Sequence, residues 1–341
     1  MILAGQALAS IVAAADTLGA GGLLGLPTET VYGLAADADN AAAVAKIFTA
    51  KGRPAEHPLI VHVADAAAAA HFASDVPAFA QALMQAFWPG PLTLILPRRQ
   101  GVAAAAAGGQ DSIGLRCPAH PVAQAVLTAC AGLVPPVLGL AAPSANQFGR
   151  VSPTTAAHVR EEFGFDLLVL DGGPCVVGIE STIVDCTRGQ PVLLRPGAIT
   201  SAELAAVCSQ TVLLPQDLAD TAPAAPRASG TLASHYAPKA RVRLMAAPVL
   251  RQSLVARQAA TAPTHLLSVG VYARTLPDSA LRMAPGLQAR RMPLTAAATA
   301  QQLFAVLREL DSTGVAEIWV ETPPDAPDWL GVMDRLERAA A

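Results

Sequence analysis

The chain has 341 residues, of which 52% are hydrophobic and only 14% are charged, so it has apolar material for more than one core and we expect two domains. Its formal net charge of -3 at pH 7 argues against a protein whose whole surface binds nucleic acid or membrane. Five cysteines without a C-x-x-C pair disfavour a zinc site or a disulfide framework, and they fit a reducing cytoplasm.

The first part of the chain predicts helices that alternate with strands. Apolar spacing predicts helices at residues 7–18, 77–87 and 121–131. Another helix is expected from a cap at Asp39 or Asn40 to Phe48, stopped by Gly52 and Pro54. Strands are predicted at residues 21–27, 59–63, 92–97 and 112–118. The apolar N-terminal segment has no basic start, so we expect no signal peptide, and no apolar run approaches the roughly 18 residues of a membrane span.

The second part predicts a strand-rich region, a linker and a smaller domain. Strands are expected at residues 137–146, 167–173, 181–186 and 191–197. One helix is expected to start in the SPTT segment with Thr154 or Ser152 as its cap, and another opens at Ser201. Residues 213–238 are rich in Pro and Ala and lack periodicity, which is typical of a linker. Beyond it, strands are predicted at residues 241–245, 265–272 and 317–321, and helices at 298–310 and 329–338.

This order predicts an α/β protein with a twisted mixed sheet flanked by helices, followed by a small doubly wound domain. The predicted boundaries are a first domain over residues 1–212, a linker over 213–238 and a second domain over 239–341. The linker is also a candidate lid over the site, through His235 and Tyr236.

Three cation-bearing segments are candidates for an anion site. Lys51 and Arg53 lie at a Lys-Gly-Arg-Pro elbow, where a point charge and a guanidinium fork suit a polyphosphate. The ordinary interpretation of such a pair is two solvated loop charges. Arg116 and Arg195 each end an apolar strand. An arginine there either forms a structural ion pair or binds an anionic ligand, and two such strands suggest convergence on one anion.

Hydroxyl groups and one histidine accompany these cations. Ser144, Ser152 and Ser181 lie at strand or helix ends, where hydroxyls and amides hold phosphate oxygens, although each alone is explained by capping or turns. His62 lies in a strand and is ordinarily a core histidine. There is no Walker loop, no G-x-G-x-x-G and no metal-binding histidine motif. These residues lead as far as an anion or nucleotide site.

Eight ordered motifs resemble the threonylcarbamoyl-AMP synthase family. They are PTETVYGL, KGRPAEHPLIVHV, WPGPLTLIL, SIGLRCPAHP, APSAN, SPTT, GIESTIVD and LRPGAI, over about residues 10 to 205, which is the YrdC-like domain. The SHYAP segment and the domain after it resemble the long form of the family, which adds a C-terminal Rossmann-like domain.

The resemblance implies an enzyme that converts ATP, L-threonine and bicarbonate to threonylcarbamoyl-AMP and pyrophosphate, the first step towards threonylcarbamoyl-adenosine in tRNA. It implies that the product passes to a downstream transferase complex, that RNA binding is weak, and that Mg²⁺ arrives on ATP rather than on protein ligands. L-Threonine positions are matched by Thr30, His62, Arg116 and Ser181. ATP positions are matched by Arg53, His57, Ser112, Ser144, Ser152 and Arg195, with Lys51 and Arg53 as the catalytic pair.

Two departures from the family pattern and two alternative functions accompany this prediction. His57 stands where the family more often has Asn or Lys, and Ala35 where it more often has Gly. Carbamoyl transfer of the hydrogenase-maturation type is disfavoured because the chain has no C-x-x-C motif and no room for an acylphosphatase domain. A non-catalytic RNA-binding module is disfavoured by the negative net charge and by an aromatic content of 4%.

Overall fold

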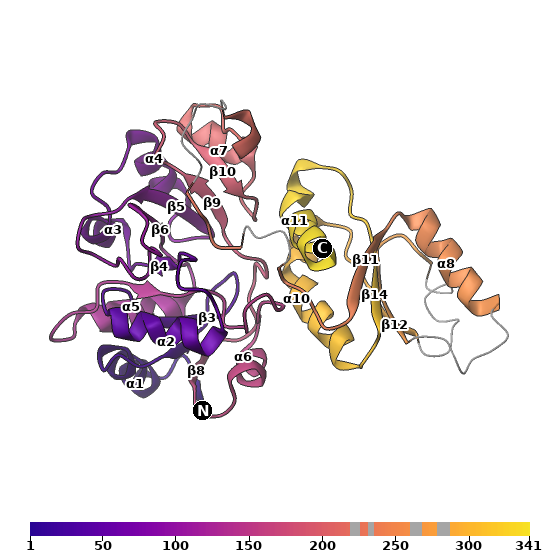
Figure 1. The fold of residues 1–341 in the computed structure, drawn as a ribbon, viewed down its shortest axis with the longest axis horizontal. Helices are drawn as coiled ribbons and strands as arrows, with labels where there is room; N and C mark the ends of the chain where they lie inside the picture. Colours follow the sequence, from indigo (N-terminus) through magenta and orange to yellow (C-terminus); the bar gives the residue numbers. More distant parts are fainter. Residues whose placement is uncertain (219–225, 231–234, 260–267, 278–286) are drawn as a thin grey trace. The chain divides into compact units, whose positions relative to one another are not determined.

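The computed structural model describes residues 1–218, 226–230, 235–259, 268–277 and 287–341 (Figure 1). The chain divides into two compact units. Unit 1 comprises Met1–Phe148 and Ser152–Thr231, and unit 2 comprises Gly149–Val151 and Leu232–Ala341. Each unit has its own sheet, and each is described by itself below.

Unit 1 is built on a ten-stranded mixed sheet with the order β1-β8-β2-β3-β7-β4-β6-β5-β9-β10. Parallel pairs such as β4 with β6 occur beside antiparallel pairs such as β5 with β6, which confirms the predicted mixed sheet. The strands are β1 (Ile2–Ala4), β2 (Leu24–Leu26), β3 (Gly33–Asp37), β4 (Ile60–His62), β5 (Leu92–Pro97), β6 (Ser112–Arg116), β7 (Leu140–Ala141), β8 (Leu168–Asp171), β9 (Thr182–Asp185) and β10 (Val192–Arg195).

Seven α-helices accompany this sheet in the described part of unit 1, and a short 3-10 helix, η1 (Pro215–Asp217), follows them. Their apolar faces and the strands form two buried clusters, one around Tyr32, Phe72 and Leu94 and one around Leu18, Leu24 and Val126. The helices are α1 (Leu8–Gly19), α2 (Ala41–Lys51), α3 (Ala66–Phe72), α4 (Ala78–Phe87), α5 (Pro121–Ala131), α6 (Ala156–Phe163) and α7 (Ser201–Cys208).

The ends of two helices test the capping predictions. The Asn40 side chain accepts a hydrogen bond from the Ala43 amide, so it is the N-cap of α2, and Gly52 ends this helix with a φ of 61°. The predicted cap of α6 at Ser152 or Thr154 is wrong, because Thr155 accepts from the His158 amide. The Ser152 hydroxyl instead donates to Glu180, across unit 1.

Several short elements were not predicted. Strands β1, β3 and β13 and helices α3 and α8 carry weak periodicity or mostly small side chains, so their hydrophobic pattern did not distinguish them. The strand predicted at residues 137–146 is reduced to β7, two residues long. The beginning of the strand predicted at residues 265–272 lies outside the described residues.

Unit 2 contains a four-stranded parallel sheet with the order β11-β14-β12-β13. Helix α8 lies on one face of this sheet and helices α10 and α11 lie on the other (Figure 1). This is the predicted doubly wound arrangement. The elements are β11 (Arg241–Met245), α8 (Ala247–Ala259), β12 (Val269–Ala273), β13 (Leu287–Arg291), α10 (Ala296–Ser312), β14 (Glu317–Glu321), η3 (Pro327–Trp329) and α11 (Leu330–Ala340).

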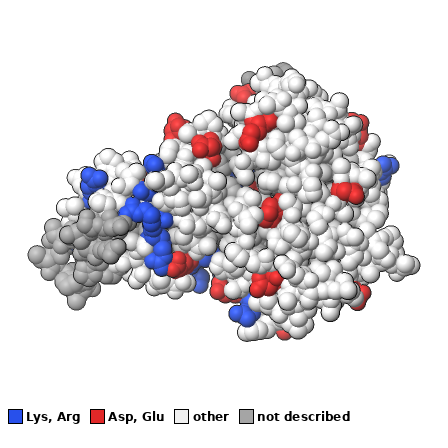
Figure 2. Space-filling model, turned by 180° about the vertical axis from the view of Figure 1, so that it is seen from behind, with Lys and Arg blue, Asp and Glu red and all other residues white. Residues whose placement is uncertain are grey.

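Charge and thiols are distributed unevenly along the chain. Residues 1–238 contain 11 Lys and Arg against 17 Asp and Glu, whereas residues 239–341 contain 12 against 9. Figure 2 shows the same contrast on one face, where Lys and Arg gather on unit 2.

All five cysteines are buried and unpaired in unit 1. No helix in the described ranges is long and apolar enough to cross a membrane.

Candidate active site

Neighbouring strands of unit 1 bring most of the predicted residues together. In the sheet order, β7, β4, β6, β5, β9 and β10 are consecutive. His62 ends β4, Arg116 ends β6 and Arg195 ends β10, while Ser181 directly precedes β9. His62 and Arg116 are paired in the parallel register of β4 and β6, so their side chains lie on the same face of the sheet. Sheet topology therefore assembles residues that are far apart in the sequence.

Arg116 is the centre of a buried polar cluster. Its Nη2 donates to Glu29 Oε1 at 2.5 Å, its Nη1 donates to Thr30 Oγ1 at 2.8 Å, and its Nε donates to the Gly90 carbonyl at 3.2 Å. The Arg116 and Glu29 side chains are 4% and 6% exposed. Of the two interpretations that the sequence left open, the structural ion pair is present. The guanidinium still directs Nη1 at Thr30, a predicted threonine-binding residue.

His62 lies beside this cluster as a neutral ring. Burial and the Arg116 charge lower the pKa of His62 to about 3. Among the described residues, neither of its ring nitrogens has a hydrogen-bond partner. The backbone groups of Ile60 and Leu140 act on the ring in the opposite direction, but burial and the Arg116 charge outweigh them.

The depressed pKa of His62 predicts a specific pH dependence of stability. Because the folded-state pKa lies below the ordinary 6.5, the neutral ring contributes stability above pH 6.5, and this contribution is lost as the pH falls towards 3. His62→Gln should remove that dependence, so the difference in unfolding free energy between wild type and variant should shift by roughly 3 kcal/mol between pH 7 and pH 4. Urea unfolding at several pH values measures it. A difference that is constant with pH would contradict the neutral buried ring.

Arg195 and Ser181 form the next part of the site. Arg195 is 2% exposed, and its Nε and Nη2 donate to the Ser181 carbonyl at 3.0 and 2.9 Å. Its Nη2 also donates to Ser181 Oγ at 3.1 Å, and that hydroxyl lies 2.7 Å from Thr93 Oγ1. Ser181 is therefore held from both sides. This bonding explains why an arginine that ends an apolar strand can be buried.

Lys51 is the last residue of α2 and is only 2% exposed. Its Nζ donates to the Ser144 carbonyl at 2.5 Å and to the Asn146 carbonyl. Burial, with the Arg53 charge as a second cause, lowers the pKa of Lys51 well below its ordinary value. The interpretation as a solvated loop charge is therefore wrong, and Lys51 ties helix α2 to the Pro-Ser-Ala-Asn turn.

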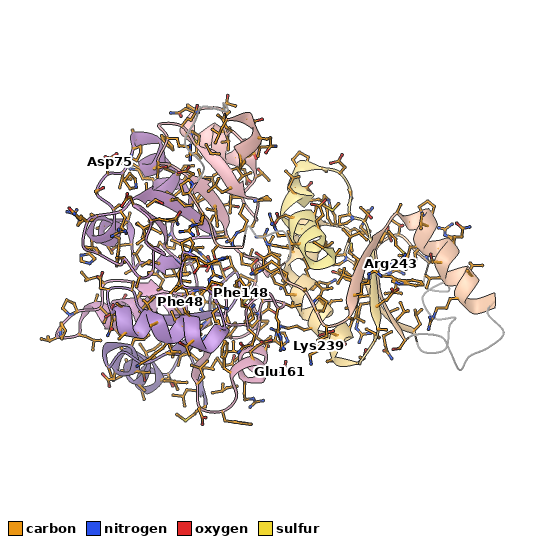
Figure 3. The ribbon with its side chains drawn as sticks, in the orientation of Figure 1. Phe48, Asp75, Phe148, Glu161, Lys239 and Arg243 are labelled. Atoms are coloured by element: carbon orange, nitrogen blue, oxygen red, sulfur yellow. The ribbon has the colours of Figure 1, made fainter. Side chains whose placement is uncertain are left out.

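Arg53 follows two residues later and lies in different surroundings. It is 7% exposed, and its Nη2 donates to the Pro58 carbonyl at 3.0 Å and to Ser229 Oγ at 3.3 Å. Its guanidinium lies 5.6 Å from the centre of the Phe148 ring, which is labelled in Figure 3. The His57 ring meets the same Phe148 ring edge-on at 5.6 Å. Burial and then the Arg53 charge lower the pKa of His57, so its cationic form is disfavoured near the predicted phosphate site.

A small cavity of about 20 Å³ is lined by Pro58 and Ser229, the two residues that Arg53 Nη2 bonds. Ser112, a predicted ATP residue, lines it together with Thr93 and with Arg227 and Ser229 from the linker. The Ser229 carbonyl also accepts from Arg195 Nη1 at 2.8 Å. A wider groove of about 690 Å³ shares Ser112 with this cavity. The described linker residues 226–230 thus line the predicted nucleotide side of unit 1.

The structure also places residues that the sequence did not single out. Glu29 pairs with Arg116, Thr93 supports Ser181, and Ser229 bonds Arg53 and Arg195. The signal for Glu29 was that it is the single charged residue between Asp16 and Asp37, a segment that is otherwise mostly apolar. Ser229 carried no signal, since its segment has the composition of a linker.

His235 and Tyr236 belong to unit 2, where they contribute to its core. The Tyr236 ring is 1% exposed and packs 5.3 Å from Phe304, and the Arg335 guanidinium lies 5.5 Å from the Tyr236 ring. The His235 amide donates to the Arg338 carbonyl at 3.1 Å. That His235 and Tyr236 form a lid over the unit 1 site stays a prediction.

No group of three or more His, Cys, Asp or Glu residues in the described ranges could hold a metal ion. The hydroxyls and guanidinium groups of the site suit oxyanions instead. The arrangement can hold anionic oxygens at buried guanidinium groups, two of which, those of Arg116 and Arg195, end strands of the sheet, while that of Arg53 follows α2.

Two family models together match almost the whole chain. The Sua5_yciO_yrdC model, described as "Telomere recombination", matches residues 16–197. The Sua5_C model, described as "Threonylcarbamoyl-AMP synthase, C-terminal domain", matches residues 199–341. The boundary between the two matches lies between β10 and α7.

Individual proteins are similar over nearly the full length. The threonylcarbamoyl-AMP synthase of Pyrococcus abyssi is 37% identical over 96% of this chain and 93% of its own. The enzyme of that name from Bacillus subtilis is 36% identical over 97% and 92%. The crystal structure of P. abyssi Sua5 complexed with L-threonine has a TM-score of 0.83 at 36% identity, over 97% of this chain and 94% of that one.

Proposed function

Since this chain belongs to the threonylcarbamoyl-AMP synthase family, we propose that it condenses ATP, L-threonine and bicarbonate to threonylcarbamoyl-AMP and pyrophosphate. The formation of threonylcarbamoyl-AMP is a nucleotidyl transfer and the first step of threonylcarbamoyl-adenosine modification of tRNA. We assign L-threonine and ATP to different parts of the site. This assignment rests on a difference between the polar groups around Arg116 and those around Arg53 and Arg195.

The threonine side of the proposed site is the cluster around Arg116. This cluster offers a hydroxyl, a neutral imidazole and a cation: the imidazole of His62 and the guanidinium of Arg116 come from adjacent strands, and the Thr30 hydroxyl bonds that guanidinium. L-Threonine carries a hydroxyl, an amino group and a carboxylate, which match such partners. Ser181 joins this side to the phosphate side, because Arg195 bonds its hydroxyl.

The phosphate side consists of Arg53 and Arg195. Both guanidinium groups are buried and both bond Ser229, so they lie close enough to share one polyanion. Buried cations of this kind stabilise charge that develops on the α-phosphate and on departing pyrophosphate. Mg²⁺ would be carried on the ATP phosphates and keep several of its waters.

Catalysis on this proposal is mainly positioning. The α-ammonium group of L-threonine loses a proton, which combines with the hydroxide that bicarbonate loses on forming CO2. The free amine attacks the carbon of CO2 and releases a second proton. The resulting carbamate oxygen attacks the α-phosphate of ATP, and pyrophosphate departs. A carbamate is unstable in water, so a buried site protects it between the two steps. Holding the carbamate and the α-phosphate in contact converts a bimolecular encounter into a unimolecular step. No covalent intermediate with the protein is required.

The test is pyrophosphate release in the presence of ATP, L-threonine and bicarbonate. We expect release that depends on both L-threonine and bicarbonate, and Arg53→Ala should lower kcat/KM by roughly 10²-fold or more, since it removes a buried phosphate-binding cation. Arg150→Ala at the surface is the matched control and should stay close to wild type. Release that ignores threonine would refute the proposed reaction.

The proposal also covers the transfer of the product to tRNA and the binding of RNA by this protein. The unstable product would pass to a threonylcarbamoyl transferase complex that acts on tRNA. The surplus of Lys and Arg in residues 239–341 supports at most a weak RNA contact on unit 2. Binding of tRNA should weaken steeply between 50 and 200 mM salt if it is electrostatic. Tight binding that does not change with salt would contradict this part of the proposal.

A further inference from the structure

Glu29 carries a buried carboxylate oxygen that has no hydrogen-bond partner in the described part of the chain. The residue is 5% exposed, and its Oε1 accepts from Arg116 Nη2 at 2.5 Å. Its Oε2 is buried and, among the described residues, has no hydrogen-bond donor. A carboxylate oxygen withdrawn from water without a donor is costly, and native proteins rarely retain one without a reason.

Other unpartnered atoms gather in the same place. Both ring nitrogens of His62 are buried and, among the described residues, lack a hydrogen bond of good geometry, although the backbone groups of Ile60 and Leu140 act on the ring. His62 is the strand neighbour of Arg116, and Arg116 holds Glu29. Within the described part of the chain, Arg116 thus has an ion-pair partner with an unpartnered carboxylate oxygen and a strand neighbour with a buried imidazole. Such a cluster indicates a site shaped for a polar ligand, because a ligand would supply the missing partners.

Charge decides which ligand fits. Arg116 and Glu29 neutralise each other, so a ligand with a carboxylate alone would add an unbalanced negative charge beside a buried carboxylate. A ligand with both an ammonium and a carboxylate adds no net charge. Its carboxylate would lie towards Arg116, and its ammonium would give Glu29 Oε2 the donor that it lacks.

We propose that Glu29 Oε2 accepts a hydrogen bond from the α-ammonium group of L-threonine and thereby makes the site selective for an amino acid. This inference rests on the proposed function, because it assigns a further residue to the threonine side of the same site. In this role Glu29 is a specificity-determining residue, and its pairing with Arg116 fixes the direction of its free oxygen.

The experiment compares two ligands in two proteins by calorimetry on the full chain. The ligands are L-threonine and its 2-hydroxy analogue, (2S,3R)-2,3-dihydroxybutyrate, which lacks the ammonium group. Wild type should prefer L-threonine by roughly 10- to 100-fold, the range of a hydrogen bond to a charged group. Glu29→Gln keeps an acceptor for Arg116 but replaces Oε2 with a donor, so it should lose most of this preference.

A purely structural role of Glu29 predicts another result. If Glu29 served only to hold Arg116, Glu29→Gln would weaken both ligands by the same factor, and the preference ratio would remain. Glu321→Gln is the matched control, because Glu321 is 2% exposed in unit 2 and its two oxygens accept from Arg274 and Thr275. It should leave both affinities at the wild-type value.

The outcomes separate this inference from the proposed function. A wild type that binds the two ligands equally overturns the inference even if Glu29→Gln does not fold. A variant that keeps the preference ratio also overturns it, while threonine-dependent pyrophosphate release keeps the proposed function intact. Absence of any L-threonine binding to the wild type overturns both.

Discussion

Arg116→Met should lower the unfolding free energy of unit 1 by about 3–5 kcal/mol, because it leaves the buried Glu29 carboxylate without its counter-charge. Methionine fills a similar volume and cannot donate, so the bonds to Glu29 Oε1, Thr30 Oγ1 and the Gly90 carbonyl are all lost. Urea unfolding at neutral pH measures the change. The same variant should lose L-threonine binding.

Two comparisons isolate the unpaired charge. Arg243→Met removes an ion pair with Glu317 at 3.4 Å in which Arg243 is 48% exposed, and it should cost less than about 1 kcal/mol. In the double variant Glu29→Gln/Arg116→Met, both charges are absent, so its loss of stability should be smaller than that of Arg116→Met alone. A double variant that is less stable than the single one would show that lost packing, rather than the unpaired carboxylate, dominates.

Lys51→Met should impair both activity and stability. The substitution removes the buried donor of the Ser144 and Asn146 carbonyls, which should lower the unfolding free energy by about 2–4 kcal/mol. The Pro-Ser-Ala-Asn turn would lose its tie to α2, so kcat/KM for pyrophosphate release should fall by roughly 10²-fold or more. Stopped assays of pyrophosphate and urea unfolding measure the two effects.

Lys46→Met is the matched control for Lys51. Lys46 lies on the same helix, its Nζ also donates to a carbonyl, that of Gly21 at 2.6 Å, and its side chain is exposed. Its loss should change stability by less than about 1 kcal/mol and leave activity near wild type. If Lys51→Met lost activity with unchanged stability, Lys51 would act on phosphate directly rather than by holding the turn.

Local sequence signals predicted the elements that carry the site, but not the pairings that assemble it. The Asn40 cap and the Gly52 stop of α2 are encoded within a few residues, and both are present. The register that sets His62 beside Arg116 joins residues from strands 54 positions apart, and nothing local specifies it. Lys51 and Arg53 were predicted as one cationic elbow. Because Gly52 reverses the chain at a φ of 61°, they bond different segments.

The contacts of the linker are a second feature that the sequence composition did not predict. Residues 213–238 lack periodicity, which predicted a segment without regular structure. Yet Ser229 bonds Arg53 through its hydroxyl and Arg195 through its carbonyl. A backbone carbonyl is the same in every residue type, so a contact made through it leaves no trace in the sequence. Contacts of this kind are found only from coordinates.

Labelling of the five cysteines can report the opening of unit 1. All of them lie buried in unit 1, and burial raises the pKa of each one, to about 12 at Cys130. A thiol reagent therefore reacts only while unit 1 is open, and the rate of modification follows the population of the opened state. Unit 2 has no cysteine and contributes nothing to that signal. Ligands that close the site can thus be ranked by how far they slow labelling, without an added probe.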